Sequence, residues 1–263
     1  MSRVIRSPAV AGTFYPGEAS ELAAAVDGHV AAGRPVPALA GRRLEALIAP
    51  HAGYVYSGPV AGTAYRLLRE SAAARVRRVV LLGPAHYVPV RGLAGPGASG
   101  LATPLGTVPV DPSTAQAAAS APDAHAPEHS LEVHLPFLQR VLSPGFTVVP
   151  LLVGRAGPEE VAEALERFWG EDGTIVLVSS DLSHYLTYER ARAMDEETAR
   201  SIEALDVDAL ESERACGAAP VRGLLLAARR RGLRCDRLDL RNSGDTEGDR
   251  RRVVGYGAFA LTS

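Results

Sequence analysis

Polar residues of the kinds that bind metals or carry protons follow four apolar runs of this sequence, at the point where each run ends. These residues are His51, His86, Asp181 with His184, and Asp245. The runs are short and rich in Val, Leu and Ile, which predicts buried strands. The carboxyl ends of parallel strands meet at one edge of an open sheet, where ligand sites are commonly built. The sequence therefore predicts that these side chains converge on one site.

A metal centre is the chemistry that this group of residues favours. Two imidazoles and a carboxylate with open positions form the donor set of non-haem Fe(II) sites, and the same donors hold zinc in hydrolases. We predict His51 and His86 as ligands, although a lone histidine at a strand end is more often a structural hydrogen-bonding group. Two such ends together favour the ligand interpretation, and the residues alone leave the metal open.

Asp181 and His184 lie three residues apart after the same strand. This spacing suggests that His184 is a general acid–base group and that Asp181 orients it. The alternative is that Asp181 caps a helix and His184 lies on the surface.

Two further segments supply candidates for a substrate pocket. Residues 128–136 pack four ionisable side chains into seven positions, and residues 11–16 and 51–58 combine aromatic side chains with glycines. The predicted substrate-contacting residues are Phe14, Tyr15, Tyr54, His129, Glu132 and His134. The alternative is a solvated helix start for residues 128–136 and a packing role for the aromatic residues.

Cysteine content indicates a reducing compartment. Cys216 and Cys235 have neither CxxC spacing nor the density of a secreted protein, and no early apolar run reaches 18 residues. We therefore expect a cytoplasmic protein. Cys216 precedes a predicted helix, where a thiolate is favoured, but free cysteines are usually buried small hydrophobic residues.

Apolar runs alternate with amphipathic stretches, which predicts an α/β fold with a largely buried sheet. The predicted strands are residues 46–49, 79–82, 148–153, 174–178, 238–240 and 253–261. The predicted helices are residues 59–69, 159–169, 188–205 and 221–231. Residues 91–127, rich in Gly, Pro, Ala and Ser, predict a lid or an inserted hairpin. No composition break divides the core, so we expect a single domain over residues 1–263.

Composition excludes several functions. All 28 basic residues are arginine, so Schiff-base and Walker-lysine chemistry is excluded. The formal net charge is −2, with no block of like charges, so neither nucleic acid nor a membrane surface is an expected partner.

Six segments taken together resemble the Memo family, called AmmeMemoRadiSam system protein B in prokaryotes. The matching segments are residues 8–16 (PAVAGTFYP), 49–54 (APHAGY), 83–86 (GPAH), 128–136 (EHSLEVHLP), 179–185 (SSDLSHY) and 242–245 (NSGD). They follow one another along nearly the whole chain, so the resemblance is specific.

This resemblance implies a fold similar to the class III extradiol dioxygenases, an α/β/α sandwich around a mixed, largely parallel sheet. His51 and His86 match the two histidine ligands of the dioxygenase Fe(II), and His184 matches their acid–base histidine. Eukaryotic Memo proteins have a cysteine near the C-terminal end, where this sequence offers Asp245 with Thr246 and Glu247 beside it. A carboxylate there favours Fe(II) over a copper site built on thiolate. Cys216 and Cys235 do not match that position.

Three functions are consistent with these observations. The first is an Fe(II)-dependent oxidoreductase acting on an unidentified small molecule, and the second is a zinc-dependent hydrolase built on the same ligands. The third is a non-catalytic metal- or ligand-binding partner of AMMECR1-type and radical SAM proteins, which the prokaryotic family name implies. Resemblance to a dioxygenase fold does not transfer the reaction.

Overall fold

The computed structural model describes residues 4–36 and 41–263, which build a nine-stranded sheet and a small three-stranded one. Strand order in the main sheet is β10-β12-β2-β9-β3-β8-β4-β7, and β11 pairs with β12. Its strands are β2 (Leu44–Ala49), β3 (Arg78–Pro84), β4 (Leu93–Gly95), β7 (Ala119–Ser120), β8 (Thr147–Val153), β9 (Thr174–Ser179), β10 (His184–Leu186), β11 (Arg234–Asn242) and β12 (Val253–Thr262). The helices are α1 (Ala19–Ala32), α2 (Tyr54–Ser71), α3 (Thr114–Ala117), α4 (Pro122–His125), α5 (His134–Val141), α6 (Pro158–Glu166), α7 (Tyr188–Glu203) and α8 (Ala218–Arg230).

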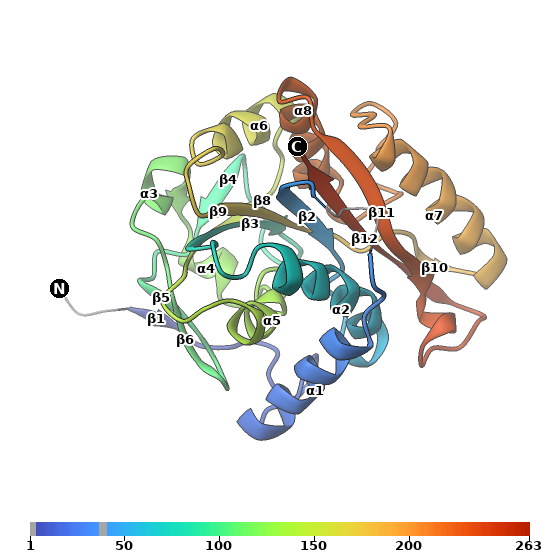
Figure 1. The fold of residues 1–263 in the computed structure, drawn as a ribbon, viewed down its shortest axis with the longest axis horizontal. Helices are drawn as coiled ribbons and strands as arrows, with labels where there is room; N and C mark the ends of the chain where they lie inside the picture. Colours follow the sequence, from blue (N-terminus) through green and yellow to red (C-terminus); the bar gives the residue numbers. More distant parts are fainter. Residues whose placement is uncertain (1–3, 37–40) are drawn as a thin grey trace.

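Helices cover both faces of the main sheet, so the predicted α/β/α sandwich is confirmed. Figure 1 shows α6 and α8 above the sheet and α1, α2 and α5 below it. Successive residues of a strand point to opposite faces of the sheet. Leu47 therefore belongs to the core between the sheet and α1, α2 and α5, whereas Ile48 belongs to the core between the sheet and α6 and α8. A central strand buried on both faces appears in the sequence as a continuous apolar run.

The centre of the sheet is parallel, as expected for strands linked through helices. β2, β9, β3 and β8 pair in parallel, whereas β12 pairs antiparallel with β2, and β11 antiparallel with β12. All six predicted strands are present, and the four predicted helices correspond to α2, α6, α7 and α8. The helix predicted from residue 59 begins earlier, at Tyr54, and contains Pro59.

Residues 91–127 include an inserted hairpin, the second of the two predicted alternatives. β5 (Gly100–Thr103) and β6 (Gly106–Pro109) pair antiparallel, and Gly106 supplies the positive φ of +114° that their tight connection requires. β1 (Ile5–Arg6) adds to β5 and completes the small sheet. The segment also contributes β4 and β7 to the edge of the main sheet farthest from β11.

Buried Glu132 anchors the N-terminal segment. Its Oε2 accepts hydrogen bonds from the Arg6 guanidinium at 2.6 Å and from Ala9 N at 2.7 Å. Its Oε1 accepts from Val10 N at 3.0 Å and from the Tyr15 hydroxyl at 2.5 Å. One carboxylate therefore satisfies four donors from a segment more than 100 residues away in sequence.

A second buried carboxylate, Asp195 of α7, supports the loop that leads into β10. Asp195 is 2% exposed, and its Oδ1 accepts a hydrogen bond from Ser183 N at 2.9 Å. Its Oδ2 has no hydrogen-bond partner among residues 4–36 and 41–263. Burial raises the pKa of Asp195 to about 6, because the hydrogen bonding from Ser183 only partly offsets the desolvation.

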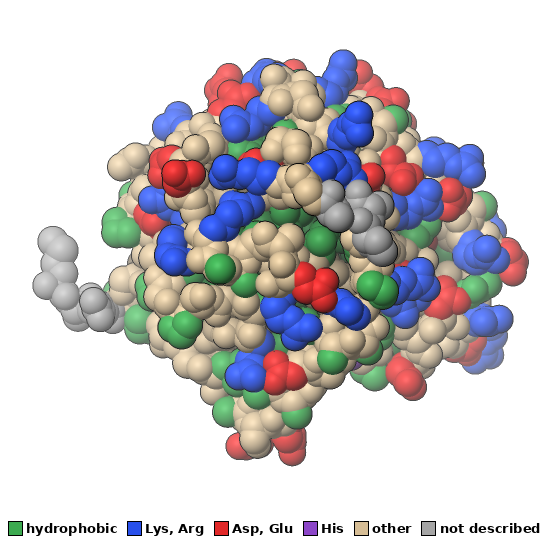
Figure 2. All heavy atoms as spheres, viewed as in Figure 1, with side chains coloured by type: hydrophobic (Ala, Val, Ile, Leu, Met, Phe, Trp, Pro, Cys, Tyr) green, Lys and Arg blue, Asp and Glu red, His purple; other side chains and the backbone are tan. Residues whose placement is uncertain are grey.

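The surface in Figure 2 interleaves arginine with acidic side chains, and neither sign forms a continuous field on that face. Among the described helices, none has the length and apolar character needed to span a bilayer.

Replacing Glu132 with alanine should lower the free energy of unfolding by about 3–5 kcal/mol, because it leaves the Arg6 charge without its carboxylate partner and two backbone N–H groups without an acceptor. Tyr15→Phe removes one hydrogen bond of the same cluster and should cost about 1 kcal/mol. Urea unfolding followed by circular dichroism measures both, and a Glu132→Ala loss below that of Tyr15→Phe would contradict this role.

Replacing Asp195 with asparagine should change how stability depends on pH. Between pH 4 and 6 the folded wild type holds a proton that the unfolded chain has already released, so its stability should fall as pH rises through this window. Relative to Asp195→Asn, the wild type should lose up to about 3 kcal/mol across the window and nothing further above it. Urea unfolding of both proteins at pH 4, 5, 6 and 7.5 measures the difference, and parallel profiles would refute it.

Candidate metal centre

The three neighbouring strands β2, β9 and β3 bring His51, Asp181 and His86 to one edge of the sheet. Each residue follows its strand by two residues, and the strands are parallel, so the three side chains surround one cavity of about 660 Å³. The lining residues are Phe14, His51, Ala52, Gly53, His86, Tyr87, His129, Asp181, His184, Tyr185, Ser212, Glu213, Cys216 and Val254. The predicted convergence of these three strand ends is therefore observed.

Cys216, from the loop before α8, completes the group of potential ligands. Its Sγ lies 3.3 Å from Nε2 of His51. Donor atoms of His51, His86 and Cys216 all lie within 4.8 Å of one another, so one ion could contact all three after a small contraction. Gly217 permits this approach, because a Cβ there would lie 2.6 Å from the carbonyl oxygen of Ser179.

The ring orientation of His51 is fixed by the hydroxyl of Ser179. Ser179 donates its hydrogen to the carbonyl of Ser130 at 2.6 Å. Its oxygen is therefore the acceptor at 2.6 Å from Nδ1 of His51, so that Nδ1 must carry the proton. Burial, reinforced by the neighbouring histidines, lowers the pKa of His51 well below its usual value. The ring is neutral, and its Nε2 lone pair faces Cys216.

His134 supports Ser179 from below the cavity. Its Nε2 lies 2.9 Å from the Ser179 hydroxyl and donates to it, while Nδ1 accepts from the Tyr65 hydroxyl at 2.8 Å. Burial lowers the pKa of His134 to about 3, so this imidazole is neutral too. His134 therefore helps to position the Ser179 hydroxyl, which in turn orients the ring of His51.

Glu128 orients His86 in the same way. One carboxylate oxygen accepts from the backbone N–H of His86 at 2.6 Å, and the other lies 2.9 Å from its Nδ1. Burial alone would raise the pKa of Glu128, but the hydrogen bonds from His86 and Ser130 outweigh it and hold the pKa at about 2. The ionised carboxylate can only accept, so Nδ1 of His86 donates and Nε2 is left for a ligand.

His86, Glu128 and His129 form a second close group of donor atoms. The Glu128 oxygen nearest both imidazoles already accepts from the backbone N–H groups of His129 and Ser130, each at 2.9 Å. With its lone pairs used by four donors, Glu128 acts as an orienting group for His86 and not as a ligand of a second ion.

Asp181 and His184 both line the cavity, but they do not form the predicted pair. Asp181 Oδ1 accepts from the backbone N–H of His51 at 2.8 Å, so this carboxylate fixes the ligand loop instead of orienting His184. Burial raises the pKa of Asp181 to about 7, against the opposing hydrogen bonds from the N–H groups of His51 and Ala52. The ring of His184 lies at the mouth of the cavity, and desolvation lowers its pKa.

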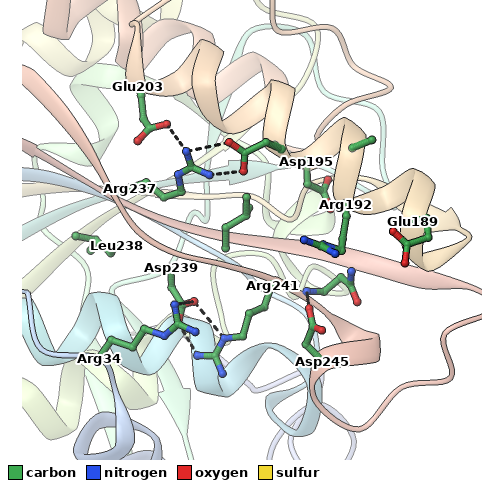
Figure 3. A pocket seen from close by; sticks show the side chains of 14 residues that line it. Arg34, Glu189, Arg192, Asp195, Glu203, Arg237, Leu238, Asp239, Arg241 and Asp245 are labelled. Carbon is green, nitrogen blue, oxygen red and sulfur yellow. Dashed lines mark hydrogen bonds and ion pairs between the residues drawn. The ribbon is translucent and has the colours of Figure 1, made fainter.

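Asp245, expected as the third ligand, lies in a different cavity, so that prediction is corrected. Its carboxylate accepts from the Tyr188 hydroxyl at 2.6 Å and from Asn242 N at 3.0 Å, closing a short 3₁₀ turn after β11. Figure 3 shows it beside Arg241 in a charged cavity of about 740 Å³ between α7 and β11. The reason is strand order: β12 separates β11 from β2, so this strand end lies too far along the sheet edge.

The predicted substrate-contacting residues divide into two sets. Phe14 and His129 line the cavity, with ring centroids 4.7 Å apart. The remaining four are buried supports that do not line it, namely Tyr15, Tyr54, Glu132 and His134. Their polar groups are used by hydrogen bonds inside the core, to the backbone and to other buried or partly buried side chains.

Two exposed tyrosines at the cavity mouth were not predicted. Tyr87 is 54% exposed and Tyr185 is 64% exposed, and Tyr185 adopts a left-handed backbone with φ of 58°. Each directly follows a histidine of the site, in the dipeptides His86-Tyr87 and His184-Tyr185. Their position next to these histidines was the sequence signal that could have predicted exposed tyrosines at the cavity, because a large aromatic side chain beside a strand-end histidine has little room to turn inward.

Comparison with known proteins places the chain in a family. The family model described as "Memo-like protein" matches residues 6–260. The chain is similar to MEMO1 family protein MK0963 of Methanopyrus kandleri, with 34% identity covering 97% of this chain and 98% of the relative. It is also similar to MEMO1 family proteins of Aquifex aeolicus (35% identity, 96% and 97% covered) and Aeropyrum pernix (36% identity, 98% and 99% covered). The chain therefore belongs to the Memo family.

Proposed function

We propose that this protein is a metal-dependent enzyme in which His51, His86 and Cys216 hold one transition-metal ion. One observation carries the proposal: both imidazoles have their Nδ1 proton fixed by a buried acceptor, which leaves each Nε2 free. Donor atoms of both histidines lie within 4.8 Å of the same thiol. Orientation of ligand histidines by hydrogen-bonded partners is typical of metal sites. A histidine with only a structural role would not need its Nε2 to be grouped with the metal-donor atoms of two other residues.

The donor set suits an ion with an affinity for nitrogen and sulfur. Imidazole and thiolate together bind zinc, copper and iron, and three protein ligands leave positions open toward the cavity. Burial and the nearby Asp181 carboxylate raise the pKa of the Cys216 thiol, so it ionises only when a cation is bound. The thiolate departs from the two-histidine, one-carboxylate set of the dioxygenases.

Fe(II) is the ion we place first, because His51, His86 and His184 match the dioxygenase histidines by resemblance. Bound Fe(II) would supply redox chemistry toward dioxygen and a chelating substrate. The protein's own part is proton transfer. Asp181 in the cavity wall, with a pKa of about 7, can accept or release a proton near neutral pH. His184 at the cavity mouth, whose pKa is lowered by desolvation, can accept a proton as a neutral base. Phe14 and His129 present ring faces and edges against which a small substrate can pack.

The thiolate itself favours a second candidate, a zinc-dependent hydrolase. Zinc is held by mixed nitrogen and sulfur ligands, and a zinc-bound water is ionised near neutral pH. His184 would then take the proton of that water. Indifference to oxygen separates this function from the first.

The interaction with AMMECR1-type and radical SAM proteins, inferred from the family resemblance, stays a proposal. A non-catalytic metal carrier in such a complex is the alternative to catalysis at this site. It requires metal binding but no turnover, so activity measurements on loaded protein distinguish it from both enzymes.

Anaerobically purified protein should bind close to one Fe(II) or Zn(II) per chain, and Cys216→Ala or His51→Ala should abolish stoichiometric binding, because each removes a donor. Cys235→Ala is the matched control, since it removes the other free cysteine, which lies in β11 away from the cavity. Asp245→Asn should also bind normally. Metal analysis after gel filtration, with titration of the metal-free protein, measures all five proteins.

Two outcomes contradict the proposal. Binding lost in Asp245→Asn and kept in Cys216→Ala would restore the carboxylate as ligand. Wild-type protein without a titratable site would remove both enzyme functions. Iron retained in preference to zinc, together with oxygen consumption, supports the redox function over the hydrolase.

Ser179→Ala and Glu128→Gln should each weaken metal affinity by roughly 10–100-fold without changing the stoichiometry at saturation, because they release the ring orientation and not a ligand. Competition with a chromophoric chelator measures the affinities. Ser71→Ala is the matched control, since its hydroxyl donates to the carbonyl of Leu67 within α2 and contacts neither imidazole nor Cys216. Equal affinities in all three variants would show that the hydrogen bonds to Nδ1 do not tune the site.

A further inference from the structure

A second cavity of about 520 Å³ lies on the other side of Cys216 from the metal ligands. It shares Ser212 and Cys216 with the metal pocket, so the two cavities adjoin at the thiol. The remaining walls come from the end of β3, the end of β8 and the first residues of α8. Nothing in the metal-binding proposal uses this cavity.

Two arginines, Arg91 and Arg155, are the only charged residues among residues 4–36 and 41–263 that line it. They are direct neighbours across a parallel β-bridge, and Arg155 N donates to the carbonyl of Val90 at 2.9 Å. Both side chains are exposed, and within the described part of the chain neither guanidinium has a carboxylate partner. Two like charges held side by side repel each other unless an anion lies between them.

The charged cavity between α7 and β11 offers a comparison, because acidic side chains line it together with arginines. There Arg237 is paired with Glu196 and Glu203, and Arg241 with Asp239, as the dashed lines in Figure 3 show. Carboxylates already balance the charges of those two guanidiniums. The cavity beside Cys216 is different, because among the described residues no carboxylate lines it.

The positive end of a helix adds to the potential of the two arginines. α8 spans 13 residues and begins at Ala218, and Ala218, Ala219 and Pro220 all line the cavity. The helix dipole places a partial positive charge at this end. Pro220 has no N–H and Ala218 N donates to the carbonyl of Ala215, so the contribution comes from the dipole and not from a row of free N–H groups. The two arginines supply full positive charges, and the helix end adds a partial positive charge.

We propose that Arg91 and Arg155 form an anion subsite, which binds the carboxylate or phosphate group of a small-molecule ligand whose remainder passes Cys216 into the metal pocket. Arginine's planar fork suits either oxyanion, because both accept two parallel hydrogen bonds. Each cavity falls within the roughly 300–1,000 Å³ typical of small-molecule sites. The subsite stands on the arginines and the cavity alone, whereas its link to a metal-bound ligand rests on the proposed function.

The test is calorimetric titration of metal-free protein with inorganic phosphate and, separately, with malonate. Arg91→Gln and Arg155→Gln should each weaken binding by at least about tenfold, the loss expected for a hydrogen bond to a charged group. Arg69→Gln is the matched control, because Arg69 is equally exposed, has no carboxylate partner among the described residues and lies near the far end of α2. The stronger of the two ligands identifies the group that the subsite prefers.

His51→Ala keeps the test independent of the metal. If the subsite is correct, this variant should bind phosphate or malonate as the wild type does. Binding lost in His51→Ala and retained in the two arginine variants would place the anion at the metal ligands and overturn the subsite. So would equal weakening by Arg69→Gln, or no binding of either anion to the wild type. Protein that binds the anion but no metal would keep the subsite and refute the proposed function.

Discussion

The candidate centre depends on one buried hydroxyl at the end of the central parallel strands. Ser179 is the last residue of β9, between β2 and β3, and its register partner in β2 is Ala49, two residues before His51. Because Ser179 donates to a carbonyl, it can only accept from the histidines on either side, so one hydrogen bond sets the proton positions of both rings. The parallel register places the strand ends side by side, and the hydrogen bonds of this hydroxyl fix the orientation of the imidazole rings there.

Burial sets the charge state of each group in the site, except where hydrogen bonds offset the cost of desolvation. The two deeply buried imidazoles, His51 and His134, are neutral because desolvation disfavours their cations. Glu128 stays ionised because four donors converge on it, and it would therefore balance part of the charge of an ion held at His86. Neutral imidazoles oriented by such hydrogen-bonded partners are the arrangement on which the proposed metal centre rests.

The sequence predicted the parts of the fold and site that depend on local pattern. Continuous apolar runs identified the strands, and the polar residues directly after them identified His51, His86 and Asp181. Strand order is not local, so the interposition of β12 that excludes Asp245 could not be seen. α5 was obscured by Pro136, which is tolerated because it lies in the first turn, where no intrahelical N–H bond is needed.

The other differences between the sequence predictions and the structure come from contacts between segments distant in sequence. Tyr15 and Glu132 lie 117 positions apart, and their hydrogen bond inside the core turns two candidate pocket residues into structural ones. Cys216 joins His51 across 165 positions, from a loop and not from a strand end. Its local signs were its place before a predicted helix and the following glycine, whose missing side chain lets the loop approach β9.

X-ray absorption at the metal edge tests the central claim most directly, because it counts the sulfur and nitrogen neighbours of the ion. The account predicts one sulfur at about 2.3 Å and two imidazole nitrogens at about 2.0–2.1 Å in wild-type protein loaded with zinc, and in Cys235→Ala alike. A first shell of nitrogen and oxygen alone, with no sulfur in the wild type, would contradict the assignment of Cys216 and with it the proposed centre.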